Sequence, residues 1–222
     1  MKVLVINGSP RMEKGNTALV LDPFLEGMRE AGADVELFYT SKLKISSCVG
    51  DFICWNKTPG KCFIQDNMQM LYPKLRNANI LVLATPVYIP LPADMQNFIN
   101  RIVPLMDPIL EMRKRHTRVK MRGDIKISKI VLVATSGWWE KGNFGTVLRI
   151  VKELAEDASV EFAGAVLRPH ASYLREDNEK TKKVIKAVKQ AGYELVKDGR
   201  MSPNVLRAIS RPLISLDAFL SN

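Results

Sequence analysis

Long apolar runs are missing from this 222-residue sequence. The apolar stretch at residues 1–6 is too short for the central region of a signal peptide, and it leads directly into a turn. No other run approaches the length that spans a bilayer. We therefore expect a cytoplasmic protein without a membrane partner. Its apolar content of 46% is ample for one substantial core.

Residues and motifs of several common chemistries are also scarce. Histidine occurs only at His116 and His170, and neither lies in a pattern typical of a metal ligand or a general base. No Ser-His-Asp arrangement or metal-ligand spacing is present, so we expect no protein nucleophile and no single-metal site. Gly8 and Gly15 enclose six residues and Asn16 follows them, which excludes a P-loop. A Gly-x-Gly-x-x-Gly dinucleotide fingerprint is missing as well.

The sequence does contain apolar strands that alternate with helical patterns. Strands are predicted at residues 3–6, 35–39, 80–85, 127–135 and 160–167. Helices are predicted at residues 16–31, 66–77, 92–105, 143–157 and 178–197. Pro23 and Pro73 fall inside two of these helices, where a proline predicts a kink or a break. The alternation favours an α/β fold with three layers, in which helices cover both faces of a doubly wound, five-stranded parallel sheet of order 2-1-3-4-5.

A polar loop follows the first strand and precedes the first helix. It contains two glycines, and its polar residues include Ser9, Arg11, Asn16 and Thr17. The first turn of a helix has backbone N–H groups without partners and a partial positive charge, so a phosphate docks there readily. The loop therefore predicts a phosphate cradle.

The end of the third strand is the second informative position. In a sheet of this order, ligands bind beyond the carboxyl ends of the first and third strands. Here the third strand runs into Pro86, Val87 and Tyr88. Because Pro86 stops the ladder, we expect the backbone N–H groups of Val87 and Tyr88 to be free for the edge of a planar ring. The alternative is a proline-rich surface loop with Tyr88 packed against a helix.

Together these motifs resemble the NAD(P)H-dependent FMN reductase and iron–sulfur flavoprotein branch of the flavodoxin-like superfamily. The resemblance covers nearly the whole chain. It rests on Gly8-Ser-Pro-Arg with Gly15-Asn-Thr17, on Thr85-Pro-Val-Tyr88 with Asn97-Phe-Ile-Asn-Arg101, and on the cysteine segment ending in Gly60-Lys-Cys-Phe-Ile-Gln-Asp66.

The resemblance implies an FMN site with three parts. Ser9, Arg11, Asn16 and Thr17 would hold the phosphate of FMN. Pro86, Val87 and Tyr88 would line the isoalloxazine ring, and the loop of Ser136, Gly137 and Trp138 would close the other side. The implied activity is an FMN-dependent oxidoreductase that passes hydride from NAD(P)H to the flavin and on to a quinone, flavin or protein acceptor.

The alternative function is an iron–sulfur-type flavoprotein that carries electrons and exchanges them with a ferredoxin-like partner. Members of the family commonly complete the FMN site across a subunit contact, which implies a homodimer or a homotetramer. The sequence does not choose between NADH and NADPH.

The three cysteines lie within fifteen residues, at Cys48, Cys54 and Cys62. Such clustering indicates metal or redox chemistry rather than disulfides in a reducing compartment. The iron–sulfur members of the family carry four cysteines, but Asp51 stands in the second place here. An intact cluster would need Asp51 or a solvent species as its fourth ligand. The other interpretation is an inherited scaffold whose buried thiols pack like small apolar groups.

Basic residues give the chain a net charge of +10 and gather in two blocks, residues 113–122 and 180–189. We expect solvated faces and a mobile loop there, with steering of acidic partners as an alternative. No nucleic-acid partner is expected, because the blocks lack interleaved aromatics and a recognisable module. We expect a flavodoxin-like FMN-binding domain at residues 1–200 and a helical appendage at residues 201–222. The appendage would pack on its own domain or on a neighbouring subunit.

Overall fold

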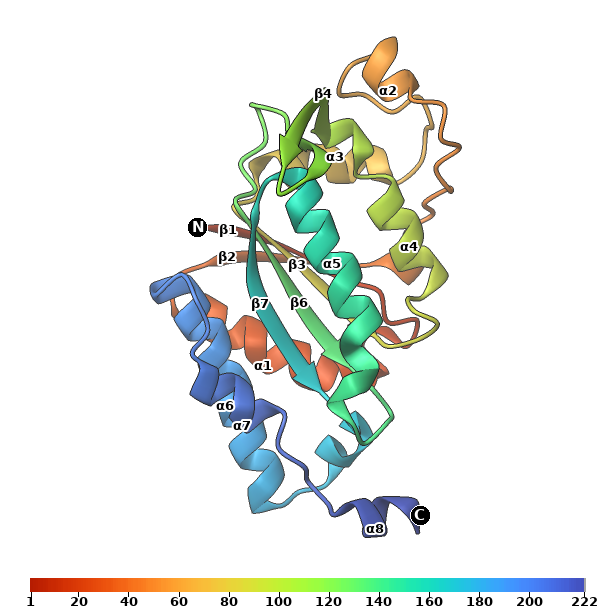
Figure 1. Cartoon of the computed structure of the whole chain (residues 1–222). Coiled ribbons are helices and arrows are strands. Elements are labelled where there is room, and N and C mark those ends of the chain that lie inside the picture. The colour runs from red at the N-terminus through yellow and green to blue at the C-terminus, as the bar shows by residue number, and fades with distance from the viewer. Residues whose placement is uncertain (222) are drawn as a thin grey trace.

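A computed structural model describes residues 1–221 of the chain as three layers around one parallel sheet (Figure 1). The sheet contains β1 (Lys2–Asn7), β2 (Asp34–Tyr39), β3 (Ile80–Pro86), β6 (Lys129–Thr135) and β7 (Glu161–Arg168). Its order is β2-β1-β3-β6-β7 and every neighbouring pair is parallel. The predicted fold class and strand order are therefore confirmed. The central strands are buried on both faces, as expected from their unbroken apolar runs.

Alternate side chains of the central strands enter two separate cores. Val5 and Val82 pack on the face that is covered by α1 (Asn16–Glu30) and α6 (Glu179–Lys197). Ile6 and Leu83 pack on the other face, under α3 (Met68–Asn77), α4 (Ala93–Asn100) and α5 (Gly145–Ala158). The predicted helices thus form both outer layers, and α1 and α3 continue through Pro23 and Pro73 instead of breaking there.

The helices α1 and α6 are in backbone contact. A Cβ atom added at Gly27 would stand 1.9 Å from the backbone oxygen of Lys189, and one added at Gly192 would stand 2.0 Å from that of Phe24. Only glycine permits this approach, which holds α6 against the helix that follows the polar loop.

The first basic block does not form the expected mobile loop. Residues 106–121 form an antiparallel hairpin of β4 (Met106–Arg113) and β5 (His116–Met121). Its charges are partnered by the end of α5, because Arg118 pairs with Glu153 at 2.7 Å and with Asp157 at 3.1 Å. Arg113 donates to the backbone oxygen of Glu156 at 2.8 Å. The expected loop was wrong, because these residues pair as two strands and Arg113 and Arg118 contact the end of α5. Lys114, Arg115 and Lys120 are exposed, as expected for a solvated face.

The C-terminal segment forms α7 (Pro203–Ile209) and α8 (Leu216–Leu220), and it packs on its own chain. Ile209 and Leu213 are buried in the core beside α6. The Arg168 guanidinium donates to the backbone oxygens of Ile209 at 2.6 Å and Arg211 at 2.9 Å. The short helix α2 (Ile53–Asn56) lies in the cysteine segment, and its Trp55 Nε1 donates to the backbone oxygen of Val103 at 3.0 Å. Short 3-10 turns occupy Met12–Lys14, Thr40–Lys42, Val103–Leu105, Lys141–Phe144 and Ala171–Arg175. Across residues 1–221, no helix is both long and apolar enough to cross a membrane.

Candidate functional site

A cavity of about 190 Å³ lies at the carboxyl ends of β1, β3 and β6. This is the switch point of the sheet, where ligands of doubly wound folds bind. Nine of the ten predicted site residues line it, and only Trp138 does not. Its full lining is Ser9, Arg11, Gly15, Asn16, Thr17, Pro86, Val87, Tyr88, Thr135, Ser136, Gly137 and Ala171.

The loop after β1 forms one wall with buried hydroxyl groups. The backbone N–H of Gly8 donates to Ala84 across the ladder at 2.8 Å, and that of Ser9 donates to the Asn7 side-chain oxygen at 2.8 Å. These two bonds fix the loop at the end of the strand. The hydroxyls of Thr17 and Thr135 lie 2.9 Å apart and are both buried. The wall therefore presents hydroxyls and the first turn of α1, and Arg11 is exposed at its rim.

Gly15 gives the loop its close curvature. A Cβ atom added there would lie 2.4 Å from Ser9 Oγ and 3.3 Å from the backbone oxygen of Met12. The glycine therefore leaves space for the hydroxyl that faces the first turn of α1. This is the kind of tight, side-chain-free cradle that suits a phosphate group.

Arg175 contacts this wall from outside the cavity lining, and no motif in the sequence predicted it. Its Nε and Nη2 donate to Asn16 Oδ1 at 3.2 and 3.0 Å, and Nη2 donates to the backbone oxygen of Lys14 at 2.9 Å. The 3-10 turn after β7 carries Arg175 to the start of α1. A contact between residues this far apart in the chain depends on the sheet order, so no local pattern predicts it.

The turn after β3 corrects one expectation. The Val87 N–H donates to the backbone oxygen of Thr135 at 2.8 Å, and the Tyr88 N–H donates to that of Pro90 at 2.9 Å. Neither N–H is free for a ring edge, because the parallel ladder continues past Pro86 and the turn then closes on itself. Tyr88 lines the cavity and is 52% exposed at its mouth.

The loop after β6 divides into an inner and an outer part. Ser136 and Gly137 line the cavity, whereas Trp138 lies outside the lining and its side chain is 62% exposed. The Trp138 N–H donates to Ser136 Oγ at 3.0 Å, and its carbonyl accepts from His170 N–H at 2.7 Å. The next residue, Trp139, donates through Nε1 to the backbone oxygen of Ile214 at 3.2 Å. The C-terminal segment therefore contacts this loop and stabilises it.

The cysteine segment surrounds a second, smaller cavity of about 90 Å³, which shares no lining residue with the first. All three cysteines and Asp51 line it. Cys54 is buried, and burial together with the neighbouring Cys62 and Cys48 raises the pKa of its thiol to about 11. Within residues 1–221, no three His, Cys, Asp or Glu side chains converge as a single metal ion requires.

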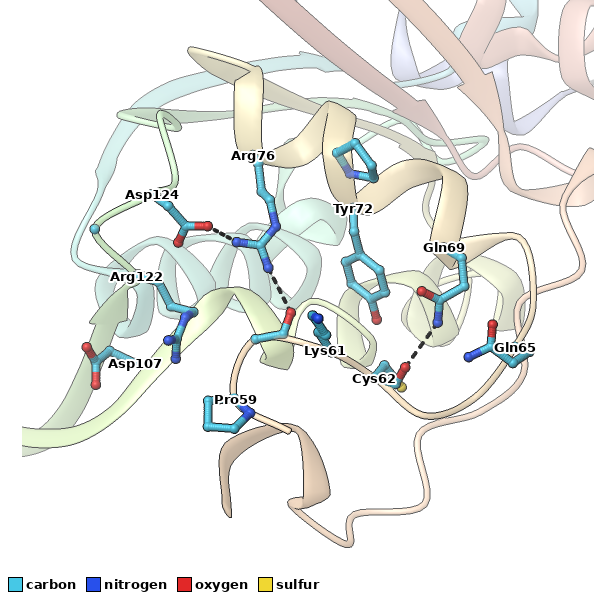
Figure 2. A pocket seen from close by; sticks show the side chains of 13 residues that line it. Pro59, Lys61, Cys62, Gln65, Gln69, Tyr72, Arg76, Asp107, Arg122 and Asp124 are labelled. Carbon is cyan, nitrogen blue, oxygen red and sulfur yellow. Dashed lines mark hydrogen bonds and ion pairs between the residues drawn. The ribbon is translucent and has the colours of Figure 1, made fainter. Parts of the chain in front are cut away.

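The loop that carries Cys62 is anchored to α3, as Figure 2 shows. Arg76 donates to the backbone oxygen of Gly60 at 2.7 Å and also pairs with Asp124. Gln69 donates to the backbone oxygen of Cys62 at 3.1 Å. The open hollow drawn in Figure 2, about 870 Å³, lies against the same loop. Both acidic and basic side chains line it, so it has no strong preference for charge of one sign.

A pattern for the family described as NADPH-dependent FMN reductase matches residues 1–121, more than half of the chain. The chain belongs to this family. An iron–sulfur flavoprotein of Archaeoglobus fulgidus is 36% identical over 105 residues, which are 47% of this chain and 46% of that protein. One from Methanocaldococcus jannaschii is 31% identical over 125 residues, 56% of this chain and 58% of that protein. This family member thus spans about half the length of the curated relatives it matches.

Solved structures share the fold of this FMN reductase family member. The NAD(P)H:quinone oxidoreductase of Methanothermobacter marburgensis superposes with a TM-score of 0.62 at 16% identity, over 88% of this chain and 96% of that one. An FMN-dependent NADH-azoreductase of Bacillus anthracis, in complex with FMN, gives 0.60 at 14% identity, over 88% and 99%. At these identities the likeness supports the flavodoxin-like fold alone.

Proposed function

We propose that the protein is an FMN-dependent oxidoreductase that takes hydride from NAD(P)H and delivers electrons to a quinone, a flavin or a protein. The observation that carries the proposal is the switch-point cavity, in which buried hydroxyls at the start of α1 face the Tyr88 turn. Family membership supports the same cofactor. Following the family's subunit arrangement, we expect a homodimer or a homotetramer.

The residues of the cavity fit FMN on two counts. Gly15 leaves room beside Ser9 that a Cβ atom would fill. The N-terminus of α1, a helix of 15 residues, supplies backbone N–H groups and a positive field for a phosphate.

In the mechanism, bound FMN supplies the hydride chemistry and this chain supplies binding and orientation. Ser9, Arg11, Asn16 and Thr17 would hold the phosphate. Arg175 fixes the Asn16 amide and adds positive charge at the same end. Tyr88 lines the mouth of the cavity, where it would border the ring and exclude water from that edge. Ser136 and Gly137 bound the opposite side.

The absorption spectrum of the purified protein, with FMN quantitation, tests the proposal. We expect a yellow protein that NADH or NADPH reduces in stopped-flow mixing. A colourless preparation that cannot be reconstituted with FMN would falsify the assignment. Reduction by a reduced ferredoxin but by neither nicotinamide would favour the electron-carrier alternative.

Replacing Thr17 by alanine is expected to weaken FMN binding about tenfold, the cost of roughly one polar contact in a buried site. The variant removes the hydroxyl that faces Thr135 at 2.9 Å. Flavin fluorescence titration of the apoprotein measures the dissociation constant. Thr117→Ala, at an exposed position of the hairpin, is the matched control and should bind FMN as the wild type does. Unchanged affinity for Thr17→Ala would remove this residue from the phosphate site.

Replacing Tyr88 by leucine is expected to change turnover more than binding. The ring lies at the mouth of the cavity and is half exposed, so we expect it to orient the flavin and the nicotinamide rather than to hold the phosphate. We expect kcat to fall about tenfold. This corresponds to an increase of about 1.4 kcal/mol in the activation free energy, which is similar to the contribution of one aromatic contact. Steady-state kinetics and FMN titration separate the two effects. Tyr193→Leu on α6 is the control, and an equal loss in both variants would contradict the prediction.

A second candidate function is the electron carrier with an iron–sulfur group beside the flavin. The observation that favours it is the small cavity where Cys48, Cys54, Cys62 and Asp51 meet. A cluster interposes its own iron and sulfide atoms between its ligands, so these stand further apart than the ligands of one metal ion. The side chains around this cavity can therefore suit a cluster although none converge on a single-ion site within residues 1–221. Iron and acid-labile sulfide measured on anaerobically purified protein test it.

A further inference from the structure

We infer that Asp51 supplies an oxygen ligand to an iron–sulfur cluster whose other three ligands are Cys48, Cys54 and Cys62, and that one iron of the cluster is thereby more easily lost than the others. The inference rests on the second proposed function, the electron carrier. It concerns Asp51, which stands in this chain where the iron–sulfur members of the family have a cysteine. The test measures the iron content and the EPR spectrum of the cluster.

Local backbone geometry places Asp51 at the same cavity as the thiols. Asp51 Oδ1 accepts from the Ile53 N–H at 3.0 Å, which caps the start of α2. Phe52 between them has φ +53°, a left-handed conformation that reverses the chain. Asp51 and Cys54 therefore line one cavity, although α2 begins between them. Within residues 1–221, Asp51 Oδ2 makes no hydrogen bond and is available as a ligand.

Two of the cysteines are held in position by the fold itself. Cys54 is buried on α2, and its carbonyl accepts from the Gly60 N–H at 2.9 Å. Cys62 follows on the loop that Arg76 and Gln69 fasten to α3 (Figure 2). Cys48 also lines the cavity and is exposed. Cys54 and Cys62 would therefore be in place before a cluster binds, and the exposed Cys48 and Asp51 would become ordered when it binds.

The cavity offers a buried hydrogen-bond donor to a bound group. Arg101 lines it with a side chain only 1% exposed, and its Nε has no hydrogen-bond partner within residues 1–221. The charge of Arg101 is matched by Asp66, at 2.6 Å, so its contribution to the cavity is the N–H donor that remains unused. A cluster sulfur or a ligand atom could accept from this N–H, a type of contact that tunes such clusters. The rest of the lining is mostly apolar and limits access of water: Val49, Phe52, Phe63, Ile64, Val103 and Pro104.

The carboxylate ligand from Asp51 predicts which iron the cluster loses first on oxidation. Carboxylate is a harder ligand than thiolate and binds cluster iron less strongly. One-electron oxidation by ferricyanide would release ferrous iron and free the Asp51 carboxylate. A four-iron cluster of charge 2+ would leave a three-iron cluster of charge 1+, with the electron passed to ferricyanide. The three thiolates would keep their bonds.

Anaerobic reconstitution with ferrous iron and sulfide, followed by iron counting and EPR before and after ferricyanide, tests the inference. We expect the wild type to hold about four irons per chain, to lose about one, and to gain the EPR signal of an oxidised three-iron cluster. Asp51→Ala should hold about three irons without oxidant, whereas Asp51→Cys should keep about four after it. Asp51 is exposed, so both variants should fold, and their FMN content checks this.

Three outcomes would overturn the inference. The first is equal iron content and equal resistance to ferricyanide in the wild type, Asp51→Ala and Asp51→Cys. The second is an Asp51→Cys protein that loses iron as the wild type does. The third is a wild type that takes up FMN but no iron, which would also reject the electron carrier while leaving the FMN-dependent oxidoreductase intact. A protein that binds iron but no FMN would reject that oxidoreductase instead.

Discussion

Replacing Arg101 by methionine is expected to lower the free energy of unfolding by about 3–5 kcal/mol, because it leaves a buried carboxylate without its partner. Arg101 Nη1 lies 2.6 Å from Asp66 Oδ2, and Nη2 lies 3.2 Å from Oδ1. The two side chains are only 1% and 7% exposed. Burial alone raises the pKa of the Asp66 carboxyl, but Arg101 and the N–H groups of Ser46 and Met68 together hold that pKa below its usual value.

The same arginine ties the two ends of the cysteine segment to α4. It donates to the backbone oxygens of Ser46 at 2.8 Å and Ile64 at 3.5 Å, and its own carbonyl accepts from the Tyr72 hydroxyl at 2.9 Å. Loss of the guanidinium should therefore loosen residues 46–66 before the sheet unfolds. Hydrogen exchange in this segment reports local unfolding, and urea denaturation reports global unfolding. The two measurements together show which of these the substitution promotes.

The matched control for Arg101→Met is Lys42→Met. Lys42 pairs with Glu13 at 2.8 Å, but both side chains are 55% exposed, so its loss should change stability little. The double variant Arg101→Met/Asp66→Leu should recover part of the loss, since no unpaired charge is then buried. Equal stability of Arg101→Met and Lys42→Met would contradict the prediction.

The elements that the sequence predicted are those whose residues share one environment along their length. The runs in β1, β3 and β6 are apolar at successive positions because both faces of each strand are buried, so sequence alone located them. The polar loop after β1 and the Tyr88 turn follow directly from such strands. Once the sheet order was inferred, their meeting at one cavity followed as well.

The features that the sequence missed depend on partners from other elements. The β4–β5 hairpin is rich in charge, and two of its cations, Arg113 and Arg118, contact the end of α5, which is more than thirty residues away. Whether the Val87 N–H is free depends on where the pairing between β3 and β6 ends. The residue types near Val87 do not indicate that position. Arg175 reaches Asn16 only because the turn after β7 ends beside α1.

A last group of buried polar residues links the C-terminal segment to the switch-point cavity. Arg168 ends β7, and its carbonyl accepts from the Ser136 N–H of the cavity wall at 3.1 Å. Its guanidinium lies 2.8 Å from His170 Nε2, which also accepts from the Leu213 N–H at 3.1 Å. Since both neighbours of Nε2 are donors, the neutral ring carries its proton on Nδ1. The cavity wall and residues 209–213 are therefore joined through a neutral histidine.

Acidification is expected to destabilise the fold through His170. Burial, with the adjacent Arg168 cation, lowers the pKa of the ring from 6.5 to about 4. Between these values the unfolded chain binds a proton that the folded chain does not, so stability is complete above pH 6.5 and falls as the pH approaches 4. The ring's contribution should decrease by about 2 kcal/mol between pH 7 and pH 5.

Urea denaturation of the wild type and of His170→Gln at pH 7 and pH 5 measures this contribution. A glutamine side-chain oxygen can accept from Arg168 and Leu213 but does not titrate, so the variant should lose about 2 kcal/mol less than the wild type over this interval. The intrinsic fluorescence of Trp139 should report release of the C-terminal segment in the wild type at pH 5, because its indole donates to Ile214 and stacks on His170 with ring centroids 6.3 Å apart. If both proteins lose the same stability between pH 7 and pH 5, another group carries the pH dependence and the neutral histidine does not hold the C-terminal segment to the cavity wall.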